Sequence, residues 1–152
     1  MTERSIDHAN FELERTYDAP PERVFAAWAE PIAKQRWFVG SGESDYELDF
    51  QVGGRETFRG GPPGGPVYLY EAIYADIVPG ERIVYSYTMD REATRISVSL
   101  ATITFQPRGA STALALTEYG VFLDGGDKVE FRREGVKSQM EALAELLDPQ
   151  AG

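Results

Sequence analysis

The order of apolar and polar positions divides this chain into segments of two different periods. Between Phe11 and Tyr17 the side chains alternate between a mainly apolar and a polar face, which indicates a strand with one buried face. Further strands are predicted at residues 46–50, 55–59, 67–78, 82–89, 94–105 and 111–119. From Asp127 to Asp148 the period lengthens to that of an amphipathic helix.

Two short helices are predicted between the first two strands, and each begins at a proline. We expect Asp18 to cap the first helix and Pro21 to occupy its first turn. Pro31 restarts the chain as a second helix that ends near Trp37 and Phe38. The apolar face of the first helix comprises Val24, Phe25 and Trp28. Each helix therefore carries one tryptophan.

Glycine and proline mark the connections between these elements. Gly53 and Gly54 permit the positive φ of a tight turn. Residues 60–66, with the sequence GGPPGGP, exclude regular structure, and we favour a plain hairpin tip there over a flap that covers a cavity. Gly135 lies inside the terminal helix at a cost of about 1 kcal/mol relative to alanine, which suggests a kink or a close packing contact.

The order of the elements predicts an α+β fold. Short connections between consecutive strands favour an antiparallel meander of about six or seven strands. One face of that sheet needs an apolar cover, and the C-terminal helix is the element long enough to supply it. A curved sheet that grips this helix leaves a space between them, at the end where the two short helices lie. We expect a single domain over residues 1–152, with a core at about 9–148 and no internal repeats.

Composition restricts the partners of this domain. The net charge is −10, and the densest basic cluster, Arg132, Arg133 and Lys137, lies among glutamates, so we expect a solvated helix face there. Nucleic acid and anionic membrane surfaces are therefore disfavoured as partners. The N-terminal residues lack the apolar stretch of a signal peptide, and no apolar run reaches the length of a membrane span. We expect a cytoplasmic protein.

The sequence offers little catalytic chemistry. The absence of cysteine excludes disulfides and thiolate sites, and the single histidine, His8, is expected in a frayed N-terminal segment. No metal site, cofactor or catalytic residue is predicted. Asp49, Asp76 and Glu118 lie in predicted strands and could face inward, and Arg15 is a candidate partner for one of them. For these groups we favour a structural ion pair over an acid–base role.

Aromatic side chains are the stronger evidence for a binding site. They make up 12% of the chain, and together they can form an apolar pocket with phenol hydroxyls in its wall. The candidate ligand-binding residues are Trp28, Trp37, Phe58, Tyr85, Tyr87, Phe105, Phe122 and Met140. In the strand at 67–78 the inward face stays open. The competing faces there are Tyr68, Tyr70 and Tyr74 on one side and Leu69, Ile73 and Ile77 on the other.

Several short segments occur in an order and spacing that resemble a known superfamily. They are residues 15–20 with Val24, Phe25 and Trp28; residues 36–38; Asp49 with 52–54; residues 77–79 and 81–83; residues 101–105; residues 112–120; and the Leu143 and Leu147 end of the terminal helix. Their combination resembles the SRPBCC (START-like, helix-grip) superfamily, and within it the branch named for the activator of the heat-shock-chaperone ATPase. Two positions depart from the family pattern. Ala72 or Ile73 stands where relatives often have glycine, and Val136 where they often have tryptophan.

The resemblance implies a helix-grip fold with a hydrophobic cavity between the sheet and the C-terminal helix. Relatives bind lipids, sterols, polyketides or hormones, a few catalyse cyclisation or dehydration, and others bind a chaperone. We therefore predict a protein that binds a small apolar or aromatic molecule. We favour this over an enzyme of polyketide cyclase or dehydratase type and over a chaperone-interacting module. The sequence leaves open a homodimer formed through an exposed strand edge.

Overall fold

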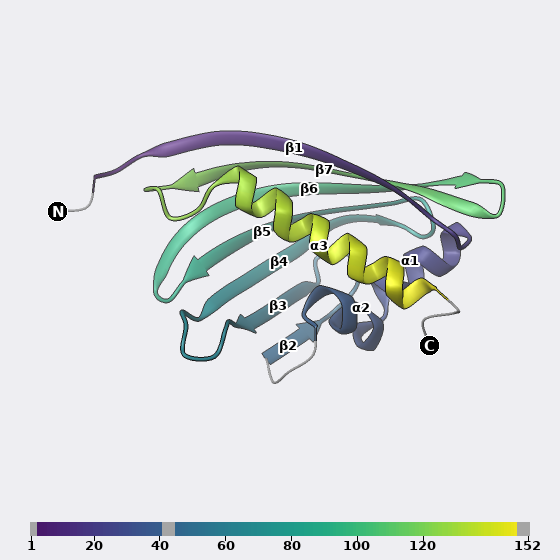
Figure 1. Cartoon of the computed structure of the whole chain (residues 1–152), viewed down its shortest axis with the longest axis horizontal. Helices are drawn as coiled ribbons and strands as arrows, with labels where there is room; N and C mark the ends of the chain where they lie inside the picture. The colour runs from purple at the N-terminus through teal and green to yellow at the C-terminus, as the bar shows by residue number, and fades with distance from the viewer. Residues whose placement is uncertain (1–2, 41–44, 149–152) are drawn as a thin grey trace.

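A seven-stranded antiparallel sheet curves around one long helix (Figure 1). The computed structural model describes residues 3–40 and 45–148. The strands are β1 (Ile6–Tyr17), β2 (Asp45–Leu48), β3 (Arg55–Gly60), β4 (Tyr68–Val78), β5 (Arg82–Arg91), β6 (Thr94–Arg108) and β7 (Ser111–Leu123). Their order across the sheet is β1-β7-β6-β5-β4-β3-β2, so every neighbouring pair except β1 and β7 joins consecutive strands. The predicted meander is confirmed.

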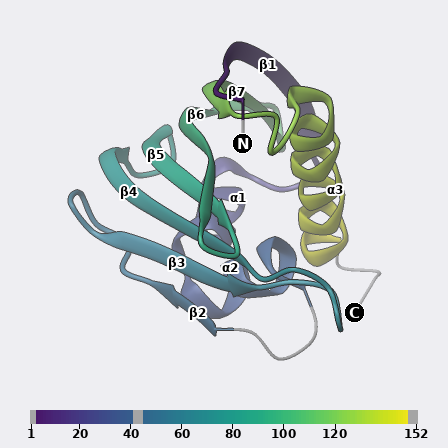
Figure 2. The ribbon, with the colours of Figure 1, turned by 90° about the vertical axis from the view of Figure 1, so that its left-hand side faces the viewer.

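The helices of the described chain lie on the concave side of the sheet (Figure 2). α1 (Pro21–Ala29) and α2 (Pro31–Phe38) follow β1 and lie together at one end of the sheet. α3 (Val129–Leu147) runs along the sheet and completes the α+β arrangement predicted from the sequence. Within the described ranges, no helix is long and apolar enough to cross a membrane.

Several strand boundaries differ from the prediction, among them the end of β6 at Arg108 and the end of β7 at Leu123. β1 begins at Ile6 rather than at Phe11, because residues 6–10 continue the antiparallel pairing with β7. His8 therefore lies in this strand opposite Val121 instead of in a frayed segment, although its side chain is exposed. β2 ends at Leu48, so Asp49 lies in the turn before β3 and not in a strand.

The start of α1 is set by proline rather than by a capping side chain. Pro20 occupies the N-cap position, Pro21 begins the helix as predicted, and no side chain caps it. The predicted cap by Asp18 is wrong, because its carboxylate accepts a hydrogen bond from Ser111 Oγ at 3.4 Å. The fixed φ of proline pre-organises the first helical turn without a side-chain cap.

α3 runs unbroken through Gly135. A Cβ added at this residue would meet no atom within 4 Å, so the expected close packing contact is wrong. The buried side of the helix comprises Arg132, Met140, Leu143 and Leu147. Gly135 lies beside this stripe, where it leaves open space rather than admitting a neighbouring backbone.

The inward face of β4 is its tyrosine face. Tyr70, Ala72 and Tyr74 are buried, whereas Ile73 is exposed. Aromatic rings fill the space beneath the sheet while their hydroxyls can reach buried polar partners. The segment before this strand joins β3 to β4 as a hairpin. At the end of this segment, the Val67 carbonyl accepts a hydrogen bond from the backbone N–H of Glu92 at 2.7 Å.

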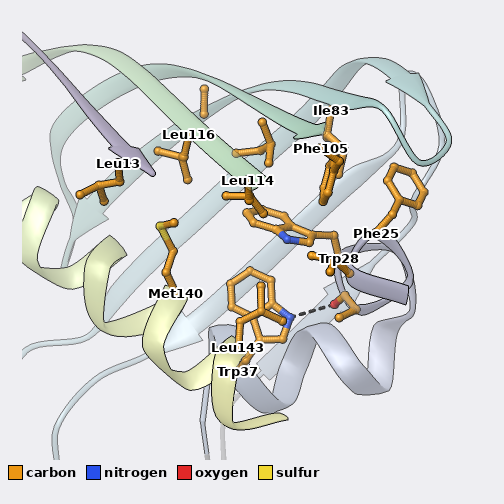
Figure 3. Close-up of a cluster of buried hydrophobic side chains, with 14 of the residues drawn as sticks. Leu13, Phe25, Trp28, Trp37, Ile83, Phe105, Leu114, Leu116, Met140 and Leu143 are labelled. Atoms are coloured by element: carbon orange, nitrogen blue, oxygen red, sulfur yellow. Dashed lines mark hydrogen bonds between the residues drawn. The ribbon is translucent and has the colours of Figure 1, made fainter. Parts of the chain in front are cut away.

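The apolar core is thickest at the end of the sheet near α1 and α2 (Figure 3). The ring of Trp28 meets that of Trp37 at a centroid distance of 4.7 Å and that of Phe105 at 6.4 Å, both edge to face. Phe25 packs against Phe105 in the same manner at 5.4 Å. Leu143 of α3 is fully buried and closes this end of the core from the opposite side.

Candidate ligand-binding cavity

A cavity of about 330 Å³ lies between the concave face of the sheet and α3. Its wall is mainly aromatic. The rings that line it are Trp28, Trp37, Phe38, Tyr68, Tyr70, Tyr85, Tyr87 and Phe131. The volume lies at the small end of the range of about 300–1,000 Å³ that is typical of ligand sites.

Small side chains occupy the middle of the sheet. Ala72, Ser99 and Gly120 lie in one row across the strands. In this row Ala72 pairs with Tyr87, Tyr87 with Ser99, and Ser99 with Gly120. Ala101 lies in the next row and is fully buried. Of the two positions that could correspond to the family glycine, Ala72 is buried and Ile73 is exposed.

The structure separates the predicted site residues into two groups. Those that line the cavity are Trp28, Trp37, Tyr85, Tyr87 and Met140. Those that lie elsewhere are Phe58, Phe105 and Phe122. Phe105 belongs to the core beside Phe25 and Trp28, Phe122 lies under the guanidinium of Arg132 at 5.3 Å, and Phe58 is half-buried on β3.

One side of the cavity carries a buried polar group of five side chains, which we call the Glu118 cluster: Glu118, Tyr87, Arg132, Ser97 and Asp127. Nη1 of Arg132 donates to the Tyr87 hydroxyl at 2.8 Å, and that hydroxyl donates to Oε2 of Glu118 at 2.7 Å. Nη2 of Arg132 donates to Ser97 Oγ at 2.7 Å and to Asp127 Oδ2 at 2.9 Å. The cluster therefore connects three strands of the sheet to α3.

Arg132 is 7% exposed, so the solvated helix face predicted there is wrong at this position. The signal that could have placed it correctly is its spacing. Arg132 precedes Val136 and Met140 by four and eight residues and lies on the same helical stripe. The prediction followed residue type, since arginine usually stays in water unless it is paired.

Burial sets the protonation behaviour of this cluster. Glu118 is 3% exposed, and burial raises its pKa above the ordinary glutamate value, while the Tyr87 hydrogen bond and the charge of Arg132 oppose the rise. The pKa of Tyr87 is also raised, chiefly by burial and then by the charge of Glu118. Tyr87 therefore stays a neutral phenol, and Glu118 is the group whose charge can change.

A second buried cluster, the Lys34 cluster, lies behind the aromatic wall of the cavity. Lys34 and Glu56 are both fully buried, and Lys34 Nζ donates to Oε2 of Glu56 at 2.8 Å. Tyr46 donates to the same oxygen at 2.6 Å, and Tyr74 donates to Oε1 at 2.9 Å. Burial lowers the pKa of Lys34, and the charge and hydrogen bond of Glu56 oppose that shift.

The Lys34 ammonium also lies against the aromatic wall. It is 4.3 Å from the ring centroid of Phe38, 5.2 Å from that of Trp28 and 5.3 Å from that of Trp37, distances at which a cation is attracted to a ring. Sequence reasoning missed this cluster entirely. Its signal is weak, because one lysine and one glutamate in short elements look like ordinary surface residues.

Two polar groups on the cavity wall are buried and make no hydrogen bond within the described part of the chain. They are the indole N–H of Trp28 and the hydroxyl of Tyr70. The neighbouring Trp37 is satisfied, since its indole N–H donates to the Ala27 carbonyl at 2.8 Å. Tyr70 OH lies near the hydroxyl of Tyr85, close enough to affect its pKa, but without hydrogen-bond geometry.

The remaining charged candidates lie outside the cavity. Asp76 accepts a hydrogen bond from Arg82 Nε at 2.5 Å on the surface. Arg15 pairs with Glu141 of α3 and not with a strand carboxylate. Among the residues that the structure describes, no group of three or more histidine, aspartate or glutamate side chains could hold a metal ion. Glu118 is therefore the one predicted inward carboxylate that faces the cavity.

Comparison with known proteins identifies the family. A family model described as "Activator of Hsp90 ATPase homolog 1-like protein" matches residues 18–148. The chain belongs to this family. The Hsp90-activator-like family is part of the SRPBCC superfamily, so the resemblance noted in the sequence is confirmed. No curated protein matched the chain in a sequence comparison.

Solved structures of the same fold include close relatives of this member of the Hsp90-activator-like family. A protein from Rhizobium leguminosarum described as uncharacterized is 42% identical, with a TM-score of 0.91 over 96% of this chain and 98% of that one. A protein from Rhizobium loti is also 42% identical, with a TM-score of 0.88 over 92% and 97%. CalU16 from Micromonospora echinospora shares the fold at 18% identity, with a TM-score of 0.66 over 99% and 88%.

Proposed function

We propose that this protein binds a small apolar or aromatic molecule in the cavity between the sheet and α3. The observation behind the proposal is the wall itself, which places eight aromatic rings around about 330 Å³ and gathers its charged side chains in the Glu118 cluster. Ligand sites usually combine an apolar wall with a few placed polar groups. Within this proposal Trp28, Trp37, Tyr85, Tyr87 and Met140 contact the ligand.

Native mass spectrometry of the protein purified from its own host tests this proposal directly. We expect a co-purifying small molecule that dissociates on unfolding. A panel of aromatic compounds with one to three rings should also raise the thermal unfolding temperature of the purified protein, because a ligand that binds only the folded state stabilises it.

A pair of variants on α3 assigns any such binding to the cavity. Gly135→Leu adds a side chain on the cavity wall, where an added Cβ meets no atom, and should abolish the thermal shift. Ser138→Leu adds the same side chain at an exposed position of the same helix that does not line the cavity, and should leave the shift intact. Equal shifts in both variants, or no shift with any compound, would contradict the proposal.

An enzyme of polyketide cyclase or dehydratase type is the second candidate function. The observation that favours it is Glu118, a buried carboxyl on the cavity wall with a raised pKa, since such a group can act as a general acid or base. Conversion of a bound aromatic polyketide analogue by the wild type but not by Glu118→Gln would support it. Binding without turnover would leave the protein a binding module.

A chaperone-interacting module and a homodimer stay predictions. A homodimer would form through an exposed edge of the sheet, at β1 or β2. A chaperone would instead meet a set of exposed apolar side chains on the inner strands. They are Ile73, Val98, Leu100 and Tyr119. Size-exclusion chromatography with light scattering, alone and with a purified chaperone, distinguishes these two predictions from a monomer that binds only small molecules.

A further inference from the structure

The Glu118 cluster leaves one side of its carboxyl group available to the cavity. Both close contacts of this carboxyl, with Tyr87 at 2.7 Å and with Arg132 at 3.9 Å, are made by Oε2. Ser99 lies beside it and favours its charged form, yet the Ser99 hydroxyl is buried without hydrogen-bond geometry to any group described. Glu118 itself lines the cavity, so its second oxygen can accept a hydrogen bond from an occupant.

Two unsatisfied donors on the same wall also favour an occupant with a polar atom. The hydroxyl of Tyr70 and the indole N–H of Trp28 are buried and unpaired within the described chain, and leaving a buried donor unpaired is costly. The ring of Tyr70 lies 4.8 Å from that of Tyr87, centroid to centroid. The cavity wall therefore offers polar atoms to an occupant, and not only an apolar surface.

The positive charges around the cavity are already paired with carboxylates of the protein. Arg132 lies 2.9 Å from Asp127 and 3.9 Å from Glu118, so its positive charge has two carboxylate partners. Behind the aromatic wall, Lys34 is paired with Glu56 at 2.8 Å. An anionic ligand would find no unpaired positive charge in this buried space, at a cost that a ligand without negative charge avoids.

We propose that the cavity selects an aromatic molecule of about two or three rings, without an anionic group, that carries a hydroxyl group, and that this hydroxyl donates a hydrogen bond to Glu118. This inference rests on the proposed function and specifies its ligand class. The aromatic body packs against Trp37, Phe38 and Tyr85, which line the wall. Glu118 distinguishes a hydroxylated ring from an equally apolar ring without a donor.

Isothermal titration calorimetry at neutral pH with three matched probes tests the inference on the whole chain. The probes are naphthalene, 2-naphthol and 2-methoxynaphthalene, which share one ring system and differ in the hydrogen-bond donor. We expect the wild type to bind 2-naphthol about tenfold or more tightly than either other probe, since a hydrogen bond to a charged group has this strength. In Glu118→Met the preference should vanish while naphthalene still binds.

Two further variants complete the experiment. Glu145→Met makes the same change at an exposed position of α3 and should keep the wild-type preference. Glu118→Gln keeps the shape of the side chain and its acceptor for Tyr87, and serves if the methionine variant fails to fold. It should reduce the preference for 2-naphthol without loss of fold.

The outcomes separate this inference from the proposal on which it rests. Equal affinities of the wild type for all three probes, or a preference that survives in both Glu118 variants, would overturn the inference while leaving a ligand-binding cavity in place. If none of the three probes binds, both the inference and the proposed function are overturned.

Discussion

Glu118 lies where the alternation of β7 would place another leucine. Leu114 and Leu116 precede it on the same face and are buried, and the carboxyl continues their row into the cavity. Removing a carboxylate from water is unfavourable unless it is paired. The Tyr87 hydrogen bond and the nearby Arg132 offset part of that penalty, and burial still raises the Glu118 pKa.

This raised pKa gives a pH dependence with a definite sign. Just above the ordinary glutamate pKa, the folded protein keeps the Glu118 proton that the unfolded chain has already released. The free energy of unfolding contributed by this group therefore falls as the pH rises toward the raised pKa. We expect Glu118→Gln to gain stability relative to the wild type as the pH rises through this window.

Urea unfolding at a series of pH values measures the effect. The difference in unfolding free energy between Glu118→Gln and the wild type should grow with pH, whereas the exposed substitution Glu145→Gln should give a nearly constant difference. A Glu118→Gln difference that is flat or shrinks with pH would show that burial does not disfavour the charged form.

The polar residues of the cavity show the limit of prediction from sequence at this scale. Glu118 could be singled out because it interrupts an apolar alternation. Lys34 and Glu56 could not, because their burial depends on α2 meeting β3 across the fold. Arg132 has the spacing of the apolar stripe but carries a charge, so a prediction from residue type placed it in solvent.

At the scale of the element, two glycines have opposite surroundings. Gly135 in the middle of α3 leaves open space where a side chain would be, whereas a Cβ on Gly120 of β7 would lie 2.8 Å from Ser99 Oγ. Neither residue is among those with a positive φ. The difference between them is therefore one of space rather than of backbone conformation.

We expect Gly135→Ala to raise the free energy of unfolding by about 0.5–1 kcal/mol, because alanine loses less conformational freedom in a helix. Gly120→Ala should lower it by about 1–3 kcal/mol, because the added methyl group overpacks the sheet against Ser99. Chemical denaturation of both variants beside the wild type measures the pair. The same sign for both substitutions would contradict this account.

The elements themselves were largely predictable from the sequence. Alternation or bounding glycine and proline residues identified the strands, and the prolines at positions 21 and 31 identified the helix starts. The errors occurred where partners decide the outcome. β1 extends to Ile6 because β7 is long enough to pair with it. The Asp18 carboxylate accepts a hydrogen bond from Ser111, the first residue of β7, instead of capping α1.

At the scale of the whole molecule, the Lys34 cluster fixes the two short helices to the far edge of the sheet. Its members come from α2, β2, β3 and β4, so four elements meet in one hydrogen-bonded group. The helices in turn present Trp28 and Trp37 to the cavity. The shape of the ligand site thus depends on an ion pair that does not line it.

Lys34→Met should therefore lower the free energy of unfolding by about 3–5 kcal/mol, because it leaves the Glu56 charge buried without its ion partner. Adding Glu56→Gln should recover part of the loss, since the amide still accepts hydrogen bonds from Tyr46 and Tyr74 without a charge. Equilibrium denaturation of the single and double variants measures this coupling. Arg82→Met, which removes an exposed pair with Asp76, serves as the control and should have a far smaller effect, because solvent screens an exposed ion pair. A Lys34→Met cost as small as that of the control would contradict this account.

The placement of Trp28 and Trp37 has a spectroscopic consequence. They are the two tryptophans of the chain, their rings are 4.7 Å apart, and both line the cavity. The tryptophan emission of the whole protein therefore originates at the cavity wall, with the phenol rings of Tyr70 and Tyr85 on the same wall as energy donors. An occupant that displaces water or absorbs near this emission changes the spectrum of the unlabelled protein. Loading, exchange and release can thus be timed by stopped-flow fluorescence without adding a dye or altering a residue.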